Sequence, residues 1–217
     1  MNKHLLSLLA IVSATFVALP TQAYFSTIDT GELVAPHAYR ATLEPQFILN
    51  KIDGANGIGR FSTGITDESS AELVLGLGAV DFQAGAFYKL IPYPDTEGQP
   101  AIGAKFGFLV ADVNDETEYN LRFHPLISKS FDTEAGILTP YGSLPLGLRV
   151  RNDTTTFPLQ IAGGVEYKVS GHENLRLMTE LGLNLSKAFD YISFAVAYNF
   201  DEENVNELRE RTSTSGQ

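Results

Sequence analysis

The chain has 217 residues, with 15 Lys and Arg against 26 Asp and Glu, and a formal net charge of −11. This excess of acids argues against nucleic acid as a partner, and the absence of cysteine excludes disulfides, thiol chemistry and a cysteine-linked lipid anchor. No metal or other cofactor is expected, because the chain also has no histidine pair at ligand spacing. The length suits one domain or two small ones.

Residues 1–23 have the pattern of a secretory signal peptide. Lys3 lies near the start, residues 5–19 are apolar or small, and Pro20 ends the run shortly before Ala23. The run is too short for a typical membrane-spanning helix. We therefore expect export and cleavage near Ala23, with a retained anchor helix as the alternative.

Between residues 24 and 200, apolar and polar residues alternate with period two, which indicates β-strands. No segment has a comparable 3.6-residue period. Gly, Asn, Asp and Pro concentrate between the alternating segments, where turns need them. The pattern predicts ten strands, at residues 37–48, 58–66, 69–77, 80–90, 101–111, 117–129, 137–150, 156–169, 173–185 and 188–200.

Alternation alone fits both a soluble lipocalin-like barrel, with its apolar face inward, and a membrane barrel, with that face outward. The apolar stripe of residues 175–185 is almost unbroken, while the polar face of the chain combines charges with glycine and alanine. Glycine weakens a solvent-facing strand but fits a crowded lumen. The strands also reach the roughly 9 to 11 residues that a tilted strand needs to cross a bilayer. We predict a closed antiparallel up-and-down transmembrane β-barrel of about ten strands, with eight as the alternative number.

The last predicted strand, "ISFAVAYNF", resembles the C-terminal signature of bacterial outer-membrane β-barrel proteins. Phe194, Val196, Tyr198 and Phe200 alternate with small or polar residues, and the strand ends on an aromatic. The machinery that inserts such barrels into the membrane reads this strand in the family, so the resemblance implies that these four residues are an assembly signal. The motif is confined to the last strand, and the family signature usually ends the chain. Here a polar tail, residues 201–217, follows it.

The longest predicted turn, "IPYPDTEGQP", falls on the periplasmic side if the barrel has ten strands and a periplasmic N-terminus. Outer-membrane barrels usually have short periplasmic turns and longer outer loops. Either this barrel has unusually short outer loops, or one of the strand predictions is wrong.

Strand parity places eight cations and five anions on the inner face of an otherwise acidic protein. With one histidine, the expected lumen residues are Arg40, Glu44, Arg60, Glu72, Asp81, Lys89, Lys105, Arg122, His124, Arg149, Glu166, Lys168, Arg176 and Glu180. Hairpin registry brings Glu166 near Arg176, and Glu44 near Arg60. The set is either an ion-pair network that fills the barrel or the lining of a narrow pore with mild anion preference.

Two further patterns have a functional and a structural interpretation. Aromatic residues near the strand ends are interpreted as an interfacial girdle rather than a ligand platform. His124 is the candidate base of a hydrolase, but the inward Ser128 lies over about 12 Å away along an extended strand. We therefore expect no enzyme and assign no catalytic residue.

The sequence thus predicts an outer-membrane β-barrel protein of a Gram-negative bacterium, either structural or a narrow porin-like channel with a charged lumen. The alternatives are a barrel-borne outer-membrane hydrolase and a soluble periplasmic lipocalin-like binding barrel. The expected partners are outer-membrane lipid, the barrel-assembly machinery and, for a pore, small solutes.

Overall fold

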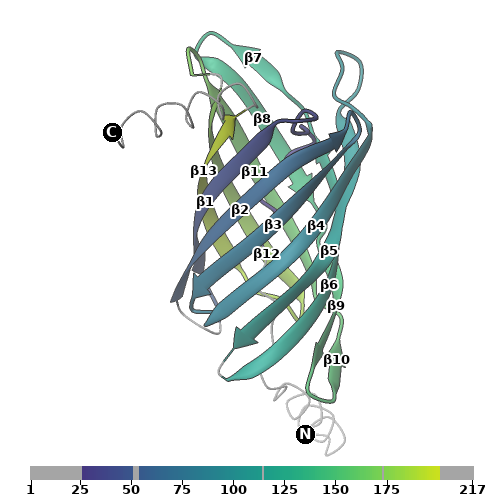
Figure 1. Cartoon of the computed structure of the whole chain (residues 1–217), viewed down its shortest axis with the longest axis vertical. Helices are drawn as coiled ribbons and strands as arrows, with labels where there is room; N and C mark the ends of the chain where they lie inside the picture. Colours follow the sequence, from purple (N-terminus) through teal and green to yellow (C-terminus); the bar gives the residue numbers. More distant parts are fainter. Residues whose placement is uncertain (1–25, 51–53, 114, 173, 201–217) are drawn as a thin grey trace, which may run out of the picture.

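The computed structural model describes residues 26–50, 54–113, 115–172 and 174–200. The predicted signal peptide, residues 1–23, and the predicted tail, residues 201–217, lie outside this part of the chain. Thirteen strands join into a single sheet (Figure 1). Among the described residues there is no helix that is long and apolar enough to cross a membrane.

Ten strands form the barrel wall, and one of them is interrupted. The first six are β1 (Tyr39–Ile48), β2 (Gly54–Thr66), β3 (Ser69–Gly78), β4 (Phe82–Tyr93), β5 (Ala101–Val113) and β6 (Glu116–Ser128). The seventh is divided into β8 (Gly136–Ser143) and β9 (Leu146–Arg151), which both pair with β6 and β11. The last three are β11 (Leu159–Val169), β12 (Leu175–Ser186) and β13 (Tyr191–Phe200).

Two short strands were not predicted. β7 (Phe131–Thr133) pairs with β8, and β10 (Thr154–Thr156) pairs with β9. Each pair is a small hairpin, and the two hairpins lie at opposite ends of the barrel (Figure 1). The interruption between β8 and β9 falls at Leu144 and Pro145. Proline has no backbone N–H to donate to a sheet, which accounts for a break at this point.

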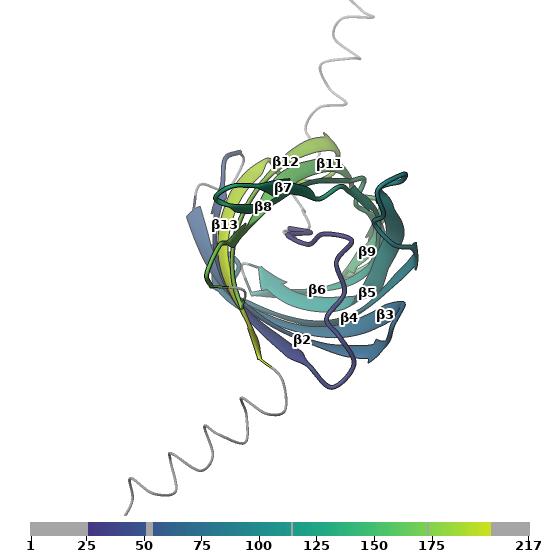
Figure 2. The ribbon, with the colours of Figure 1, turned by 90° about the horizontal axis from the view of Figure 1, so that it is seen from above.

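The first and last strands pair with each other and close the sheet. β1 runs antiparallel to β13, with Tyr39 opposite Phe200 and Ile48 opposite Tyr191. Figure 2 shows the resulting ring from above. Closure gives every wall strand a partner on both sides, which hydrocarbon surroundings demand because they offer backbone groups no water. The predicted ten-strand antiparallel barrel is confirmed, and the predicted boundaries differ from the observed ones by only a few residues.

The outer face of the barrel is apolar, and the inner face is largely polar. Leu43 and Leu121 are 72% and 61% exposed, and Leu177, Leu181 and Leu183 of the predicted stripe also point outward. Conversely, the largest fully buried side chains include arginines, a lysine and a histidine. A soluble lipocalin-like barrel requires the opposite arrangement, so this alternative is wrong.

The β4–β5 loop lies at the end of the barrel where β1 begins and β13 ends (Figure 1). Lys129 Nζ donates to Asp95 Oδ1 at 2.8 Å and Ser130 N donates to Asp95 Oδ2 at 2.7 Å, so the loop is tied to the segment after β6. Burial opposes ionisation of Asp95, but these hydrogen bonds outweigh it, so the pKa of Asp95 lies below its ordinary value. Ten wall strands are present, so the position of this loop does not result from a wrong strand number.

Leu181→Arg should destabilise the barrel by about 2–4 kcal/mol in lipid, because the side chain points outward near the middle of β12. Leu181→Ile is the matched control and should unfold like the wild type. The measurement is urea unfolding in phospholipid vesicles followed by far-ultraviolet circular dichroism, since the chain has no tryptophan. Equal midpoints for Leu181→Arg and Leu181→Ile would contradict an outward, lipid-facing position.

Candidate functional site: the filled lumen

Residues 26–34 lie inside the barrel, the exposed residues 35–37 lead from there toward β1, and we call residues 26–38 the strap. The strap has no strand of its own and crosses the interior before the chain enters β1 (Figure 2). Ser26, Thr27, Thr30 and Gly31 are buried there. The predicted barrel domain, residues 24–200, therefore contains an internal segment that sequence periodicity does not reveal.

Glu180 on β12 holds the start of the strap. Its carboxylate accepts hydrogen bonds from Thr27 N at 2.8 Å, from Ile28 N at 2.6 Å and from the Tyr191 hydroxyl at 2.6 Å. The Thr27 hydroxyl also lies 3.3 Å from His124 Nδ1 on β6, so the strap is attached to two sides of the wall.

Arg60 on β2 connects the strap to two wall acids. Its guanidinium is 2.8 Å from Glu44 Oε2 and 3.1 Å from Glu72 Oε1. It also donates to Ser26 Oγ at 2.7 Å, and the Ser26 hydroxyl in turn contacts Glu44. Removing one partner from such a buried network leaves an uncompensated charge, so these residues act together.

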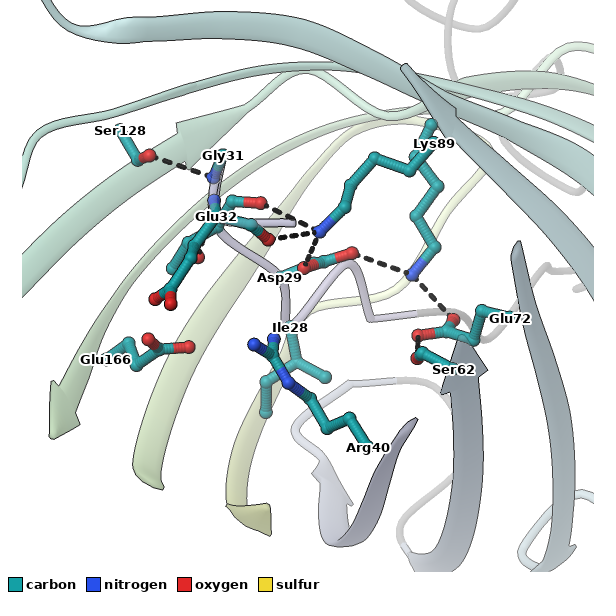
Figure 3. Close-up of polar contacts among 12 residues, drawn as sticks. Ile28, Asp29, Gly31, Glu32, Arg40, Ser62, Glu72, Lys89, Ser128 and Glu166 are labelled. Atoms are coloured by element: carbon teal, nitrogen blue, oxygen red, sulfur yellow. Dashed lines mark hydrogen bonds and ion pairs between the residues drawn. The ribbon is translucent and has the colours of Figure 1, made fainter. Parts of the chain in front are cut away.

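Asp29 of the strap continues this network toward β4 and β5. Lys105 Nζ lies 2.6 Å from Glu72 and 3.4 Å from Asp29, and Lys89 Nζ lies 2.7 Å from the other oxygen of Asp29 (Figure 3). Lys89 also donates to two strap carbonyls, at 2.8 and 3.2 Å. Acids and bases alternate along this ionic chain, which in order is Glu44, Arg60, Glu72, Lys105, Asp29 and Lys89.

A second group, the mouth cluster, surrounds Glu32 of the strap. Both terminal nitrogens of Arg176 donate to the Glu32 carboxylate, and Nη2 lies 2.7 Å from Glu32 Oε1. Nη1 of Arg176 also lies 2.6 Å from Glu166 Oε1. Lys168 is 3.8 Å from Glu32, and the Glu32 side chain is 40% exposed. The cluster is therefore the solvent-facing edge of the filled lumen.

Asp29 and Glu32 belong to the strap, outside the membrane-spanning strands, and both are held in the ionised form. Burial raises the pKa of each carboxyl, but the cations around them outweigh it. The pKa of Asp29 falls from 3.8 to about 2, and that of Glu32 from 4.5 to about 2. The strap is thus bound to the wall by two fully charged carboxylates at neutral pH.

A cluster of apolar side chains lies in the half of the lumen away from the start of β1 and the end of β13, and we call it the apolar plug. Phe189, from the turn between β12 and β13, meets side chains that β1 to β5 point inward. The members are Ile48, Ile58, Val74, Val80, Phe87, Leu109, Ala111, Val113 and Phe189. Strand parity did not predict this group, because single apolar residues on a polar face give no periodic signal.

Beside the apolar plug lies a polar group that the sequence analysis partly missed. Arg151 is 3.0 Å from Glu118, and neither residue was in the predicted set. Arg122 donates to Gln160 at 3.2 Å, and Gln160 donates to the backbone oxygen of Phe189 at 2.8 Å. Glu118 had the right parity in the predicted strand 117–129, so extending the parity argument to every position would have found it.

Large side chains of the lumen lie over glycines on neighbouring strands. A Cβ added at Gly182 would lie 2.1 Å from the Tyr191 ring, and one at Gly164 would lie 2.4 Å from the Tyr141 ring. These positions have no room for a side chain. The inward glycines therefore serve the crowded lumen that their presence on the polar face predicted.

Little space remains between the strap and the wall. The cavity beside the ionic chain has a volume of about 10 Å³. A cavity needs at least roughly that volume to hold one water molecule. The strap and the inward side chains therefore fill most of the space in this part of the lumen.

The predicted lumen residues fall into three groups. Lys168 lies at the mouth, and Asp81 is exposed in the turn between β3 and β4. Asp81 was predicted to point inward, which is wrong because the strand begins only at Phe82 and the turn breaks the parity. The other twelve are buried, namely Arg40, Glu44, Arg60, Glu72, Lys89, Lys105, Arg122, His124, Arg149, Glu166, Arg176 and Glu180. The two diagonal pairs inferred from registry, at Arg60 and at Arg176, are present.

His124 contacts the strap and Arg122 within the described part of the chain. It is 1% exposed, its Nε2 is 3.4 Å from Arg122 Nε, and its Nδ1 faces the strap. Ser128 instead accepts a hydrogen bond from Gly31 N at 2.8 Å. Within the described residues, no group of three or more His, Asp or Glu is arranged to hold a metal ion.

The four residues of the expected assembly signal lie on β13, at the seam where β13 pairs with β1. Phe194, Val196 and Tyr198 are each about half exposed on the outer face. The ring of Phe200 lies 6.0 Å from the ring of Tyr39 and 6.4 Å from that of Tyr198. Aromatic rings therefore cover the outside of the seam where β1 begins and β13 ends. This position suits an interfacial girdle.

A closed antiparallel sheet with an apolar exterior and a charged, filled interior is a β-barrel of the outer-membrane type. No protein-family model matches the sequence, and no curated protein matches it. The structure is similar to a de novo designed transmembrane β-barrel, with 15% identity over 78% of this chain and 100% of that chain, and a TM-score of 0.39.

Two solved autotransporter domains are also similar. The β domain of the Bordetella autotransporter BrkA has 10% identity over 77% of this chain and 99% of its own, with a TM-score of 0.46. The translocator domain of the autotransporter NalP from Neisseria meningitidis has 11% identity over 75% and 86%, with a TM-score of 0.39. These are barrels to which the chain is similar, and likenesses this distant carry no argument about its superfamily or function.

Acid should release the strap. Asp29 and Glu32 have folded-state pKa values of about 2, below the ordinary 3.8 and 4.5, so their contribution to stability is complete above the ordinary values and is lost as the pH falls toward 2. A Thr30→Cys probe, buried in the wild type, should react faster with 2,2′-dipyridyl disulfide across this window. An Ala35→Cys probe, exposed on the strap, corrects for the reagent.

The double substitution Asp29→Asn and Glu32→Gln should raise the labelling rate of the Thr30→Cys probe at neutral pH and flatten its dependence on acid. Both changes follow from removing the two titrating carboxylates while keeping their size. A labelling rate that changes neither with acid nor with the double substitution would refute the ionic attachment of the strap.

Gly182→Ala should destabilise the barrel by about 1–3 kcal/mol, because the new Cβ meets the Tyr191 ring and that ring is fixed by its hydrogen bond to Glu180. Gly57→Ala is the matched control, since a Cβ there has nothing within 4 Å. Urea unfolding in detergent compares the two. Similar unfolding midpoints would mean that the lumen is loosely packed near Tyr191.

Proposed function

We propose that this protein is a closed β-barrel of the Gram-negative outer membrane, with a structural role rather than that of an open porin, and without catalytic activity. The signal-peptide pattern of residues 1–23 and the C-terminal strand support export and insertion by the assembly machinery. The single observation that carries the closed state is the occupied lumen, in which the strap and the inward side chains leave a cavity of about 10 Å³.

The lumen is closed twice along its length. Toward the end where β1 begins and β13 ends, the strap binds through Glu180, the ionic chain and the mouth cluster. At the other end, the apolar plug joins Phe189 to side chains from five consecutive strands. Because the two closures lie one after the other, a solute that passed one would still meet the second, and apolar constrictions also exclude water.

A narrow anion-preferring pore is the second candidate. The buried wall side chains hold more cations than acids, which favours anions. The ion pairs that hold the strap are non-covalent, so an opened state is chemically available on that side. The apolar plug does not depend on the strap, however, and we therefore assign the closed barrel as the main form.

Purified, folded protein in planar bilayers should give no conductance above leakage at neutral pH. Insertion is verified by heat-modifiable migration on gels, because a folded barrel and a boiled chain differ in mobility. A variant that lacks residues 26–35 should also give no conductance above leakage, since the apolar plug remains in place.

The same strap deletion combined with Phe87→Ala and Phe189→Ala should conduct, because both closures are then weakened. Stable conductance steps from the wild-type protein would overturn the closed-barrel proposal in favour of the pore. Conductance from the strap deletion alone would assign the whole closure to the strap.

A further inference from the structure

Arg40 on β1 is a buried cation whose guanidinium is only partly satisfied. It is 5% exposed, and its Nε donates to Asn199 Oδ1 at 2.8 Å across the barrel seam. Its Nη2 is buried and has no hydrogen-bond partner within the described part of the chain. No acid of that part lies within ion-pair distance of Arg40, although Asp29 and Glu32 attract it from farther away.

The acids around Arg40 are already engaged by other cations. The ionic chain has three acids and three cations, and each of its acids contacts a lysine or Arg60. Glu32 and Glu166 contact Arg176 in the mouth cluster. Among the cavity-lining cations of the described chain, Arg60, Lys89 and Lys105 are therefore ion-paired, whereas Arg40 makes no ion pair. A buried charge without a counter-charge is costly, so the site favours a single negative charge beside Arg40.

The guanidinium lines the small cavity that the strap covers. Ile28, Asp29 and Val34 of the strap form one side of this cavity, and Arg40 enters from the wall. Figure 3 shows Arg40 directed toward Ile28 and the strap. The rest of the polar lining consists of the hydroxyl residues Thr42, Ser62 and Ser70, the cations Arg60, Lys89 and Lys105, and Glu72, whose carboxylate is paired with Arg60 and Lys105. Hydroxyl and ammonium groups both donate hydrogen bonds, which is the donor set that an anion needs.

We propose that this cavity binds one monatomic monovalent anion, of which chloride is the common example, between Arg40 and the strap. The volume of about 10 Å³ admits one particle close to the size of water. Sulfate, phosphate and organic carboxylates are too large for that space. The anion neutralises Arg40 and bridges the wall to the strap, so it stabilises the plugged form of the barrel.

Chloride binding is measured directly by the line width of the ³⁵Cl nuclear resonance with folded protein in detergent. The wild type should broaden the line, and bromide should compete the broadening away at equal ionic strength. Gluconate and sulfate should not compete. The thermal midpoint should rise with the logarithm of chloride concentration and show no comparable rise with gluconate or sulfate.

Arg40→Gln should abolish the broadening and the chloride-dependent shift in midpoint. If that variant does not fold, Thr42→Val replaces it and should reduce both signals by removing one lining hydroxyl. Lys168→Gln is the matched control, because it removes a lumen cation that does not line the cavity, and it should keep both signals.

A wild type whose resonance line and midpoint respond no more to chloride than to gluconate would mean that the cavity holds water only, and would overturn the proposal. Equal responses in wild type and the folded Arg40 or Thr42 variant would also overturn it, because the anion would then bind elsewhere. Neither result depends on whether the barrel conducts, so this test is separate from that of the closed-barrel function.

Discussion

Hydrogen bonding between the first and last strands, β1 and β13, is the constraint on which the architecture depends. The pairing from Tyr39–Phe200 to Ile48–Tyr191 removes the two free edges that a sheet would otherwise expose to hydrocarbon. It also puts the start and end of the wall at one end of the barrel, so the chain enters β1 at the end where the mouth cluster lies. The strap can therefore fold directly back into the lumen, and the seam residue Arg40 comes to lie beside it.

The strap resolves an imbalance of charge that the wall creates. The buried wall residues include eight cations and five acids, and the strap supplies Asp29 and Glu32 from outside the sheet. A buried ammonium or guanidinium without a partner costs far more than an exposed one. The strap carboxylates therefore supply counter-charges that the wall itself lacks, and these allow the cationic inner face to be buried.

Most of the wall was predictable because a transmembrane strand repeats one rule over many residues. Alternation located all ten wall strands and the outward leucines of β12, and parity located twelve of the buried lumen residues. Two errors lie where the alternation ends, because Asp81 is in a turn and Arg151 lies one residue past a predicted strand. Glu118 had the inward parity within a predicted strand and was overlooked. The strap has no period to detect. The only sign of it was the cation excess on the predicted inner face, which called for acids from elsewhere.

The buried charges also explain why the strands keep a single register. A slip by one residue turns every side chain of a strand to the opposite face. On β2 or β5 such a slip would put Arg60 or Lys105 into lipid, where a basic residue near the bilayer centre costs about 2–4 kcal/mol. A lumen of apolar residues would lack this penalty, since both faces would then tolerate hydrocarbon. The charged interior is therefore weak evidence for stability but a strong determinant of register, and the register in turn positions the glycines beneath Tyr141 and Tyr191.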